Sequence, residues 1–379
     1  MANAKKLSVA ELKANVDTWV AKTKIAQTSY TTVINAIDGL IEKIGKIYTN
    51  DQEFSDKLAM LDGEFLSFGK QVEEWKQDLI LPVDYANTDE VDDLKSAFPT
   101  YRPAEYSYPL GDKVFAITRS YKELQGSVHN EAQLGELIMG IQRELTNSKI
   151  SYRYAAKRQM IGRLAEMCAD EMDASKAVAW AAGTARAVNT IVKNTSSNPT
   201  KIGIVVKEYK TADNMATYDA AEAAGFVVTL DLVTKIAKPT DTATGEAFVK
   251  QVKADVEVAA DISEGHSLNG NTLGATQGQI LFVKQGLMPT LEVDVEAGAF
   301  HNEKVAVPSQ IVVLPDFGKD VDPNVYAVLV DSRTLRFFPN FEYSGSAENK
   351  TKAWVKYISH LDATAHISRN CFVKVYKAA

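Results

Sequence analysis

The histidines are the first residues whose chemistry could include metal binding or proton transfer. They are His129, His266, His301, His360 and His366. His360 and His366 are six residues apart in a segment with strand-like alternation, and an even offset places both on one face of a strand. No carboxylate or cysteine at a suitable spacing completes a ligand set around them. We therefore expect structural histidines, no metal site and no cofactor.

Two short motifs resemble catalytic signatures. Asp316-Phe317-Gly318 spells the magnesium motif of protein kinases, but the chain has neither the glycine-rich loop nor the catalytic loop of that class. Gly265-His266-Ser267-Leu268-Asn269 is close to a nucleophile elbow, but Asn269 stands where the turn needs a small residue. The surroundings indicate a turn and a polar loop, and the sequence predicts no enzyme.

A basic stripe is the strongest charge pattern. Lys149, Arg153 and Lys157 follow one another at intervals of four in a predicted helix, so they share one face. One interpretation is a solvated face with extended side chains. The other is a surface that faces nucleic acid and binds its phosphates without sequence specificity. The sequence leaves both interpretations open.

Composition limits the class of protein. The chain has 379 residues, 45% hydrophobic and 24% charged, which is typical of a soluble protein of one to three domains. Its net charge of −7 argues against binding nucleic acid by overall attraction, although it allows a local basic face. Cys168 and Cys371 are too few for a disulfide framework. Neither a signal peptide nor a long apolar run is evident, so we expect a cytoplasmic setting without a membrane.

The N-terminal 76 residues carry apolar side chains at helical spacing. Ser8 and Glu11 form a capping box, and the last stripe runs from Phe54 to Trp75 in steps of three and four. We expect helices throughout this region, packed against a partner surface.

The next segment, residues 82–119, has a different character. It contains four prolines, an acidic cluster and many aromatic residues, and it predicts two extended stretches turned near Gly111. Such a segment is too polar to form its own core. Its aromatic side chains are expected to anchor it on another surface; they are Tyr101, Tyr106, Tyr108 and Phe115.

The rest of the chain predicts one long helix and then a mixed α/β region. The helix extends from Asn130 to about Met172. Further helices are expected at 216–224 and 246–260. Strands are expected at 202–206, 226–230, 280–283, 291–295, 311–314, 326–330, 354–358 and 366–376. We expect Trp354 in the core beside a buried strand 326–330, with Asp331 and Arg333 at its end, where they could pair with neighbouring chains.

This order of elements resembles the major capsid proteins of tailed bacteriophages, which share the HK97-like fold. The stretch KVFAITRSYKELQGSVHNEAQLGELIMGIQREL is similar to the returning strand of the E-loop and the start of the spine helix. The stretches YAVLVDSRTLRFFPNFEY and KAWVKYISHLDATAHISRNCFVKVYK resemble the C-terminal strands. The resemblance covers roughly residues 78–379.

The resemblance implies an α+β chain with defined parts. They are an N-terminal helical arm (1–77), an E-loop (78–121), a P-domain with its spine helix (122–200), mainly an A-domain (201–321), and C-terminal strands that return to the P-domain (322–379). It also implies that the E-loop aromatics Tyr101, Tyr106, Tyr108 and Phe115 contact another subunit. The basic stripe Lys149, Arg153 and Lys157 could then face DNA.

The function implied is a shell subunit that self-assembles in the host cytoplasm into the icosahedral capsid of a virion. Its partners would be copies of itself in hexamers and pentamers, scaffolding, portal and decoration proteins, and packaged double-stranded DNA bound non-specifically. An encapsulin-like nanocompartment with protein cargo is the nearest alternative. A cytoplasmic α/β enzyme with an unrecognised site is an alternative of another class.

Overall fold

The computed structural model describes residues 54–66, 69, 71–77, 101–120, 131–213, 215–276, 278–287, 310–319 and 321–379. The helices expected before residue 54 and the strand expected at 291–295 lie outside these residues. The chain forms two compact units: one of residues 1–53, 118–143 and 348–355, and a second of residues 54–117, 144–347 and 356–379.

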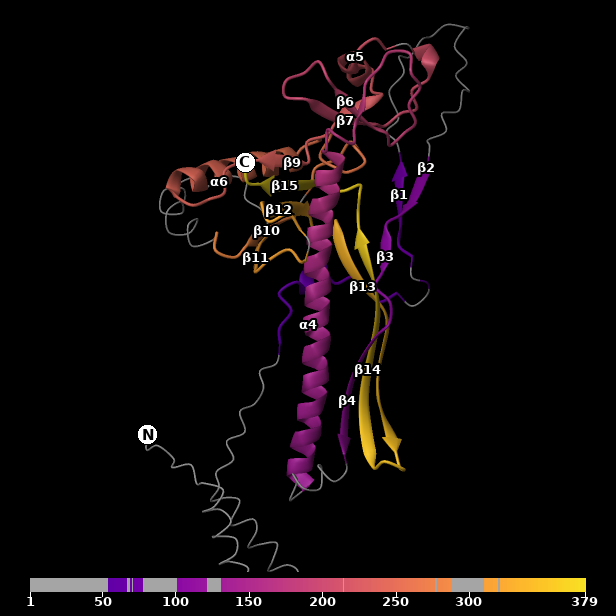
Figure 1. Ribbon diagram of the computed structural model, residues 1–379, viewed down its shortest axis with the longest axis vertical. Coiled ribbons are helices and arrows are strands. Elements are labelled where there is room, and N and C mark those ends of the chain that lie inside the picture. Colours follow the sequence, from indigo (N-terminus) through magenta and orange to yellow (C-terminus); the bar gives the residue numbers. More distant parts are fainter. Residues whose placement is uncertain are drawn as a thin grey trace, which may run out of the picture. The chain divides into compact units, whose positions relative to one another are not determined.

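A five-stranded sheet forms the centre of this unit (Figure 1). Its order is β11 (Gln310–Leu314), β10 (Gln279–Lys284), β12 (Val325–Asp331), β15 (Val373–Lys377) and β9 (Val233–Lys235). All seven residues of β12 are buried, because the strand is central and the sheet is covered on both faces. The expected strands 280–283, 311–314 and 326–330 are therefore confirmed.

Two helices cover the faces of this sheet. Helix α6 (Thr242–Ala259) begins with a capping box at Asp241 and packs Phe248 and Val252 against Tyr326 and Leu329. Helix α4 (Glu131–Glu171) contributes its C-terminal half to the core cluster that contains Val328 and Val330. The bounds of α4 agree with the predicted helix. Helix α6 confirms the helix predicted at 246–260 but begins four residues earlier, at Thr242.

A second sheet contains the longest strands. Its order is β13 (Leu335–Asn349), β14 (Trp354–Ile367) and β3 (Ser107–Pro109), and β4 (Lys113–Ser120) also pairs with β14. The prediction that Trp354 belongs to the core is wrong, since its side chain is 42% exposed. Trp354 is the first residue of β14, before the strand enters the buried stretch that begins at Leu361. β13 was not among the strands expected from alternation, although its first half lies in the stretch YAVLVDSRTLRFFPNFEY that resembled the C-terminal strands.

A smaller sheet has the order β5 (Val178–Ala179), β6 (Ile191–Asn194), β7 (Lys201–Val205) and β8 (Val227–Thr229). Helix α5 (Tyr218–Ala223) packs on it, with Tyr218 and Phe226 in an aromatic core around Tyr209. The expected strands 202–206 and 226–230 and the helix 216–224 are confirmed to within two residues at each end.

Residues 54–77 correct the prediction of a helix. Among the residues described in this range, only Ala59–Leu61 form a turn of 3-10 helix, and Glu73–Gln77 form strand β1, which pairs with β2 (Tyr101–Glu105). Leu58 and Leu61 are buried beside α4. The amides of Gly63 and Leu66 donate to the carbonyls of Phe337 and Pro339 in β13. Packing of an extended segment on its partners accounts for Leu58 and Leu61, whereas Phe54 and Phe65 of the same stripe are about half exposed. We call residues 54–66 the strap.

Candidate assembly and nucleic-acid surfaces

The aromatic residues expected at a subunit interface have different surroundings. The Tyr106 hydroxyl accepts a hydrogen bond from Asn269 Nδ2 at 2.8 Å, and Phe115 packs edge-on against Tyr152 of α4 at 5.9 Å between ring centroids. Tyr108 is exposed on β3. Tyr101 is the first residue of β2, and its side chain lies outside the described part. That these four residues contact another subunit stays a prediction. Tyr108 fits it best, because its side chain is exposed.

An aromatic patch on β13 and β14 was missed by the sequence analysis. Phe341 and Tyr343 are 49% and 56% exposed, and their rings stack at 6.5 Å with an interplanar angle of 15°. His360 lies 6.4 and 6.1 Å from these rings, and its Nδ1 is 3.3 Å from Asp112 Oδ2. We call Phe341, Tyr343 and His360 the aromatic patch. The alternation of aromatic and polar residues from Phe341 to Tyr343 was its only signal in the sequence.

The basic stripe on α4 is paired with carboxylates of its own chain. Lys157 has no exposed surface, and its Nζ lies 2.6 Å from Asp56 Oδ2 and 2.7 Å from Asp62 Oδ1. Arg153 contacts Asp62 at 3.3 Å and Glu342 at 3.2 Å. Lys149 contacts Glu342 at 3.0 Å. That the stripe faces DNA stays a prediction, and Lys157 has no exposed surface with which to meet a phosphate.

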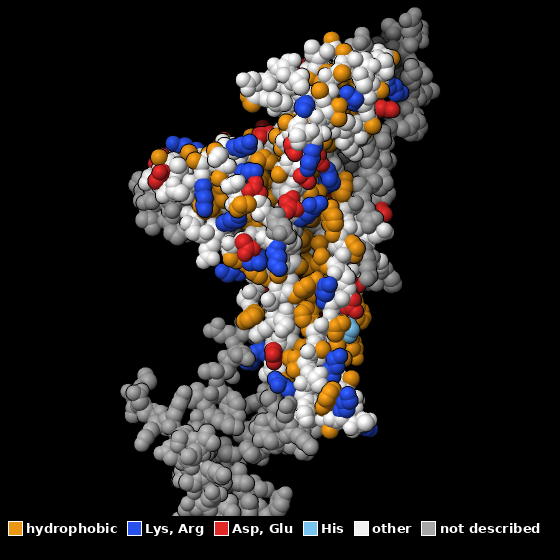
Figure 2. Space-filling model, in the orientation of Figure 1, with side chains coloured by type: hydrophobic (Ala, Val, Ile, Leu, Met, Phe, Trp, Pro, Cys, Tyr) orange, Lys and Arg blue, Asp and Glu red, His pale blue; other side chains and the backbone are white. Residues whose placement is uncertain are grey.

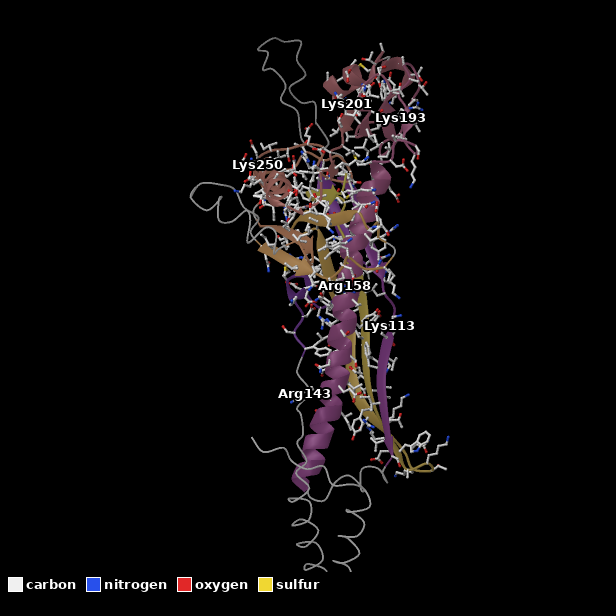
Figure 3. All side chains as sticks on the ribbon, turned by 60° about the vertical axis from the view of Figure 1, so that its left-hand side comes forward. Lys113, Arg143, Arg158, Lys193, Lys201 and Lys250 are labelled. Carbon is white, nitrogen blue, oxygen red and sulfur yellow. The ribbon has the colours of Figure 1, made fainter. Side chains whose placement is uncertain are left out.

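The remaining basic residues are distributed over many elements. On the face drawn in Figure 2, Lys and Arg side chains are interspersed with Asp and Glu, and hydrophobic side chains reach the surface among them. Figure 3 labels basic residues on β4, α4, β6, β7 and α6. One of them, Arg158, lies 3.4 Å from Asp316 Oδ1. This mixed distribution agrees with the overall acidic charge and gives no continuous basic field on the face drawn.

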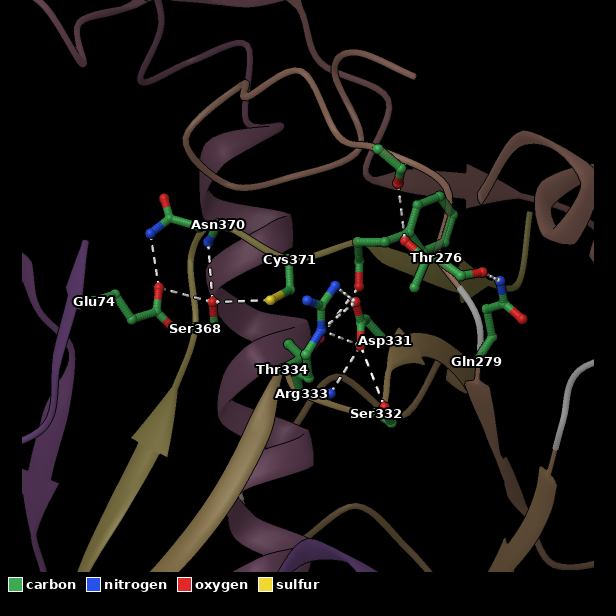
Figure 4. A network of polar contacts seen from close by, with 12 residues as sticks. Glu74, Thr276, Gln279, Asp331, Ser332, Arg333, Thr334, Ser368, Asn370 and Cys371 are labelled. Carbon is green, nitrogen blue, oxygen red and sulfur yellow. Dashed lines mark hydrogen bonds and ion pairs between the residues drawn. The ribbon is translucent and has the colours of Figure 1, made fainter. Parts of the chain in front are cut away.

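A polar network joins β1 to the turn between β14 and β15 (Figure 4). The Glu74 carboxylate accepts hydrogen bonds from Ser368 Oγ at 3.0 Å and Asn370 Nδ2 at 2.7 Å, and it lies 2.8 Å from His366 Nε2. Burial raises the pKa of Glu74, but the hydrogen bonds from His366, Ser368 and Asn370 outweigh burial and lower it overall. Glu74 therefore holds β1 on this turn as a carboxylate.

Asp331, which was expected to pair with a neighbouring chain, is instead buried and satisfied within its own. Its Oδ2 lies 2.7 Å from Arg333 Nη2, and the backbone amide of Arg333 donates to its Oδ1 at 2.9 Å (Figure 4). The Arg333 side chain reaches the surface while Asp331 does not. Only Arg333 of this pair is available to another molecule.

The motifs that resembled catalytic signatures have structural surroundings. Asp316 Oδ1 accepts a hydrogen bond from the backbone amide of Gly318 at 2.8 Å, and Gly318 has a φ of +105°. The Asp316-Phe317-Gly318 motif is therefore a tight turn after β11. Ser267 is buried and its Oγ accepts the amide of Asn271. Within the described residues, His, Cys, Asp and Glu form no group of three or more that could hold a metal ion. Helices long and apolar enough to span a bilayer are also absent from that part of the chain.

The fold defines the class of protein. The capsid of Staphylococcus phage Andhra matches with a TM-score of 0.57 at 10% identity, covering 87% of this chain and 86% of that one. A chain in the structure of the head fiber and inner core protein gp22 of native bacteriophage P68 matches with a TM-score of 0.54 at 10% identity, covering 89% and 88%. These similarities show the HK97-like fold of phage capsid proteins, as the resemblance implied.

The family follows from the sequence match. Residues 5–372 match the model of the Phi29-like phage major capsid proteins, and the chain belongs to this family. A search of curated proteins gives no match. The protein is thus a structural, shell-forming subunit of a tailed-phage virion and not an enzyme. Family membership decides against both alternatives, the nanocompartment and the α/β enzyme.

Proposed function

We propose that copies of this chain assemble as hexamers and pentamers into a closed icosahedral shell that holds double-stranded DNA. The family match over residues 5–372 carries this proposal. The net charge of −7 supports a shell that retains DNA without neutralising it by overall charge. Assembly in the host cytoplasm is part of the same proposal.

The proposed domain assignment follows the element order. Helix α4 is the spine helix of a P-domain over residues 122–200, and strands β7 and β8 with α6 belong to an A-domain over 201–321, so the smaller sheet continues across the boundary at residue 200. Strands β12 to β15 are the C-terminal strands of residues 322–379. The E-loop was placed at 78–121, and its final strands β3 and β4 pair with β14. The N-terminal arm, residues 1–77, includes the strap, which is extended apart from the 3-10 turn at Ala59–Leu61.

The proposed contacts between subunits use exposed aromatic side chains. Tyr108, Phe341 and Tyr343 keep exposed rings on the sheet of β3, β4, β13 and β14. Aromatic anchors of this kind contribute much of the binding free energy of protein interfaces. Scaffolding, portal and decoration proteins are further partners that a phage shell of this kind would bind.

Purified protein tests the proposal directly. We expect large particles in sedimentation and closed shells in negative-stain micrographs. Particles isolated from infected cells should contain nuclease-resistant DNA and absorb at 260 nm. A small soluble oligomer under all assembly conditions, with the portal and scaffolding proteins supplied, would contradict the proposed function.

A further inference from the structure

The strap carries more negative than positive charge, and two of its carboxylates contact the basic stripe. Its sequence has Asp56, Asp62 and Glu64 against Lys57. Both anionic partners of Lys157 belong to the strap, at 2.6 and 2.7 Å. Arg153 shares Asp62 with Lys157. The strap therefore supplies most of the negative charge that neutralises this face of α4.

Without the strap, the same face would be strongly basic. Of the ion pairs described above, those of Glu342 with Lys149 and Arg153 would remain, and Lys157 would lose both of its carboxylates. The three cations are spaced by about 6 Å along the helix axis, at 1.5 Å per residue. A DNA duplex presents roughly one phosphate charge per 1.7 Å of its axis. Each cation of the stripe could thus meet a phosphate.

We propose that the strap and the DNA backbone compete for one face of α4, so that the docked strap masks an anion-binding site made of Lys149, Arg153 and Lys157. The proposal rests on the proposed function, in which DNA is the polyanion enclosed by the shell. It accounts for a buried lysine whose two ionic partners both come from one short extended segment. It also accounts for the basic stripe in an acidic chain.

The contacts of the strap are of a kind that DNA can oppose. Asp56 and Asp62 are 13% and 31% exposed, so their ion pairs reach solvent at the edge of the site. The other anchors among the described residues are the buried Leu58 and Leu61, a hydrogen bond from the Phe54 amide to Asn147 Oδ1, one from Arg336 Nη1 to the Met60 carbonyl, and those from the Gly63 and Leu66 amides to the Phe337 and Pro339 carbonyls. Linkage requires that DNA weakens strap docking by the same factor by which the strap weakens DNA binding.

The first experiment measures DNA binding by the full-length, unassembled chain. A fluorescein-labelled 20-base-pair duplex is titrated with wild type, D56N/D62N and the control E64Q/E257Q, which removes two carboxylates outside the ion-pair cluster. We expect D56N/D62N to bind about tenfold more tightly, with a salt slope steeper by about 2 because two more phosphates are neutralised. Adding R153Q/K157Q to D56N/D62N should cancel the gain, because Arg153 and Lys157 are the cations that Asp56 and Asp62 neutralise. The control should stay within about twofold of wild type.

Affinity of D56N/D62N equal to that of the control overturns the proposal, and so does a gain that survives R153Q/K157Q. Circular dichroism checks that each variant is folded. If D56N/D62N does not fold, D62N alone replaces it, since Asp62 is the more exposed carboxylate. The expected gain is then smaller, with the same dependence on Arg153 and Lys157.

A second experiment needs no variant. Hydrogen exchange of wild type is followed with and without the duplex at the amides of Gly63 and Leu66, which bond to β13. Saturating DNA should raise the rate of hydrogen exchange at both amides, and an unchanged rate overturns the proposal.

The outcome also distinguishes this proposal from the proposed function. Shells that package DNA without any change in hydrogen exchange of the strap would overturn the competition and leave the proposed function intact. A chain that never forms shells would overturn the proposed function, whatever its strap does.

Discussion

Lys157 shows how one residue depends on distant parts of the chain. Its ammonium group has no exposed surface. Its carboxylate partners Asp56 and Asp62 lie 101 and 95 residues earlier in the sequence. Removing one member of a buried ion pair costs about 3–5 kcal/mol, because the remaining charge is left unpaired. Both acids keep some exposure here, so the cost should be smaller.

We therefore predict that K157M lowers the free energy of unfolding by about 2–3 kcal/mol. The methionine fills most of the volume of the lysine, so the loss reports mainly on Asp56 and Asp62. Urea unfolding of the subunit measures it. The triple variant K157M/D56N/D62N should recover at least half of the loss, because no charge is then left without a partner. If K157M were as stable as wild type, the ion pairs of Lys157 with Asp56 and Asp62 would not contribute to stability as predicted.

Glu74 gives a pH-dependent prediction. The folded protein lowers the pKa of Glu74 below its ordinary value of 4.5. The stability that Glu74 contributes is therefore fully present above pH 4.5, and it is lost as the pH falls through the pKa of the folded state. E74Q should cost about 1–2 kcal/mol at pH 6, since three donors lose a charged acceptor. The difference from wild type should shrink toward pH 3. Urea midpoints at pH 6, 4.5 and 3 test this, and a difference that stays constant would speak against the network.

At the scale of elements, the approach of Phe317 and Val321 to α4 requires a glycine on that helix. A Cβ at Gly162 would lie 2.2 Å from the Phe317 carbonyl oxygen and 2.4 Å from Val321 Cγ2. Gln159 of α4 also bonds both the amide and the carbonyl of Lys319. The turn that spells the kinase motif is therefore a docking contact on this helix.

We predict that G162A destabilises the subunit by about 1–3 kcal/mol through overpacking. The matched control is G140A, on the same helix, where an added Cβ meets nothing within 4 Å. That change should stabilise by up to about 1 kcal/mol, since alanine favours helix over glycine. Thermal unfolding of the two variants side by side distinguishes the effects. Equal behaviour would contradict the close approach.

The elements that could be predicted are those whose pattern is determined locally. The bounds of α4 agreed with the sequence because it has continuous helical spacing, and β12 was evident as an apolar run. The strap was mistaken for helix because its leucines bury against α4 and β13, which the local pattern does not show. The basic stripe was located by its spacing. The carboxylate partners of the stripe could not be located from the sequence, since Glu342 follows Lys149 by 193 residues.

At the scale of the whole molecule, the aromatic patch tests how subunits associate. F341S/Y343S should leave a folded, soluble subunit that fails to form particles, because both rings are exposed and add little to the fold. Loss of about 1–3 kcal/mol per contact repeats at every copy in a shell. Sedimentation of the variant beside wild type measures this. I262S, which replaces another exposed apolar side chain, is the comparison. Normal particles from F341S/Y343S would contradict a role of the patch in assembly.

The strap also has a consequence for synthesis on the ribosome. It is made early, but Arg336, which bonds Met60, follows by 276 residues. At about 5–20 residues per second, this interval lasts on the order of 14–55 s. Throughout it, Leu58 and Leu61 lack the Phe337 with which they share a core cluster, and no β13 backbone exists for Gly63 or Leu66 to bond. The nascent subunit therefore exposes apolar residues that a chaperone could bind until its C-terminal strands emerge.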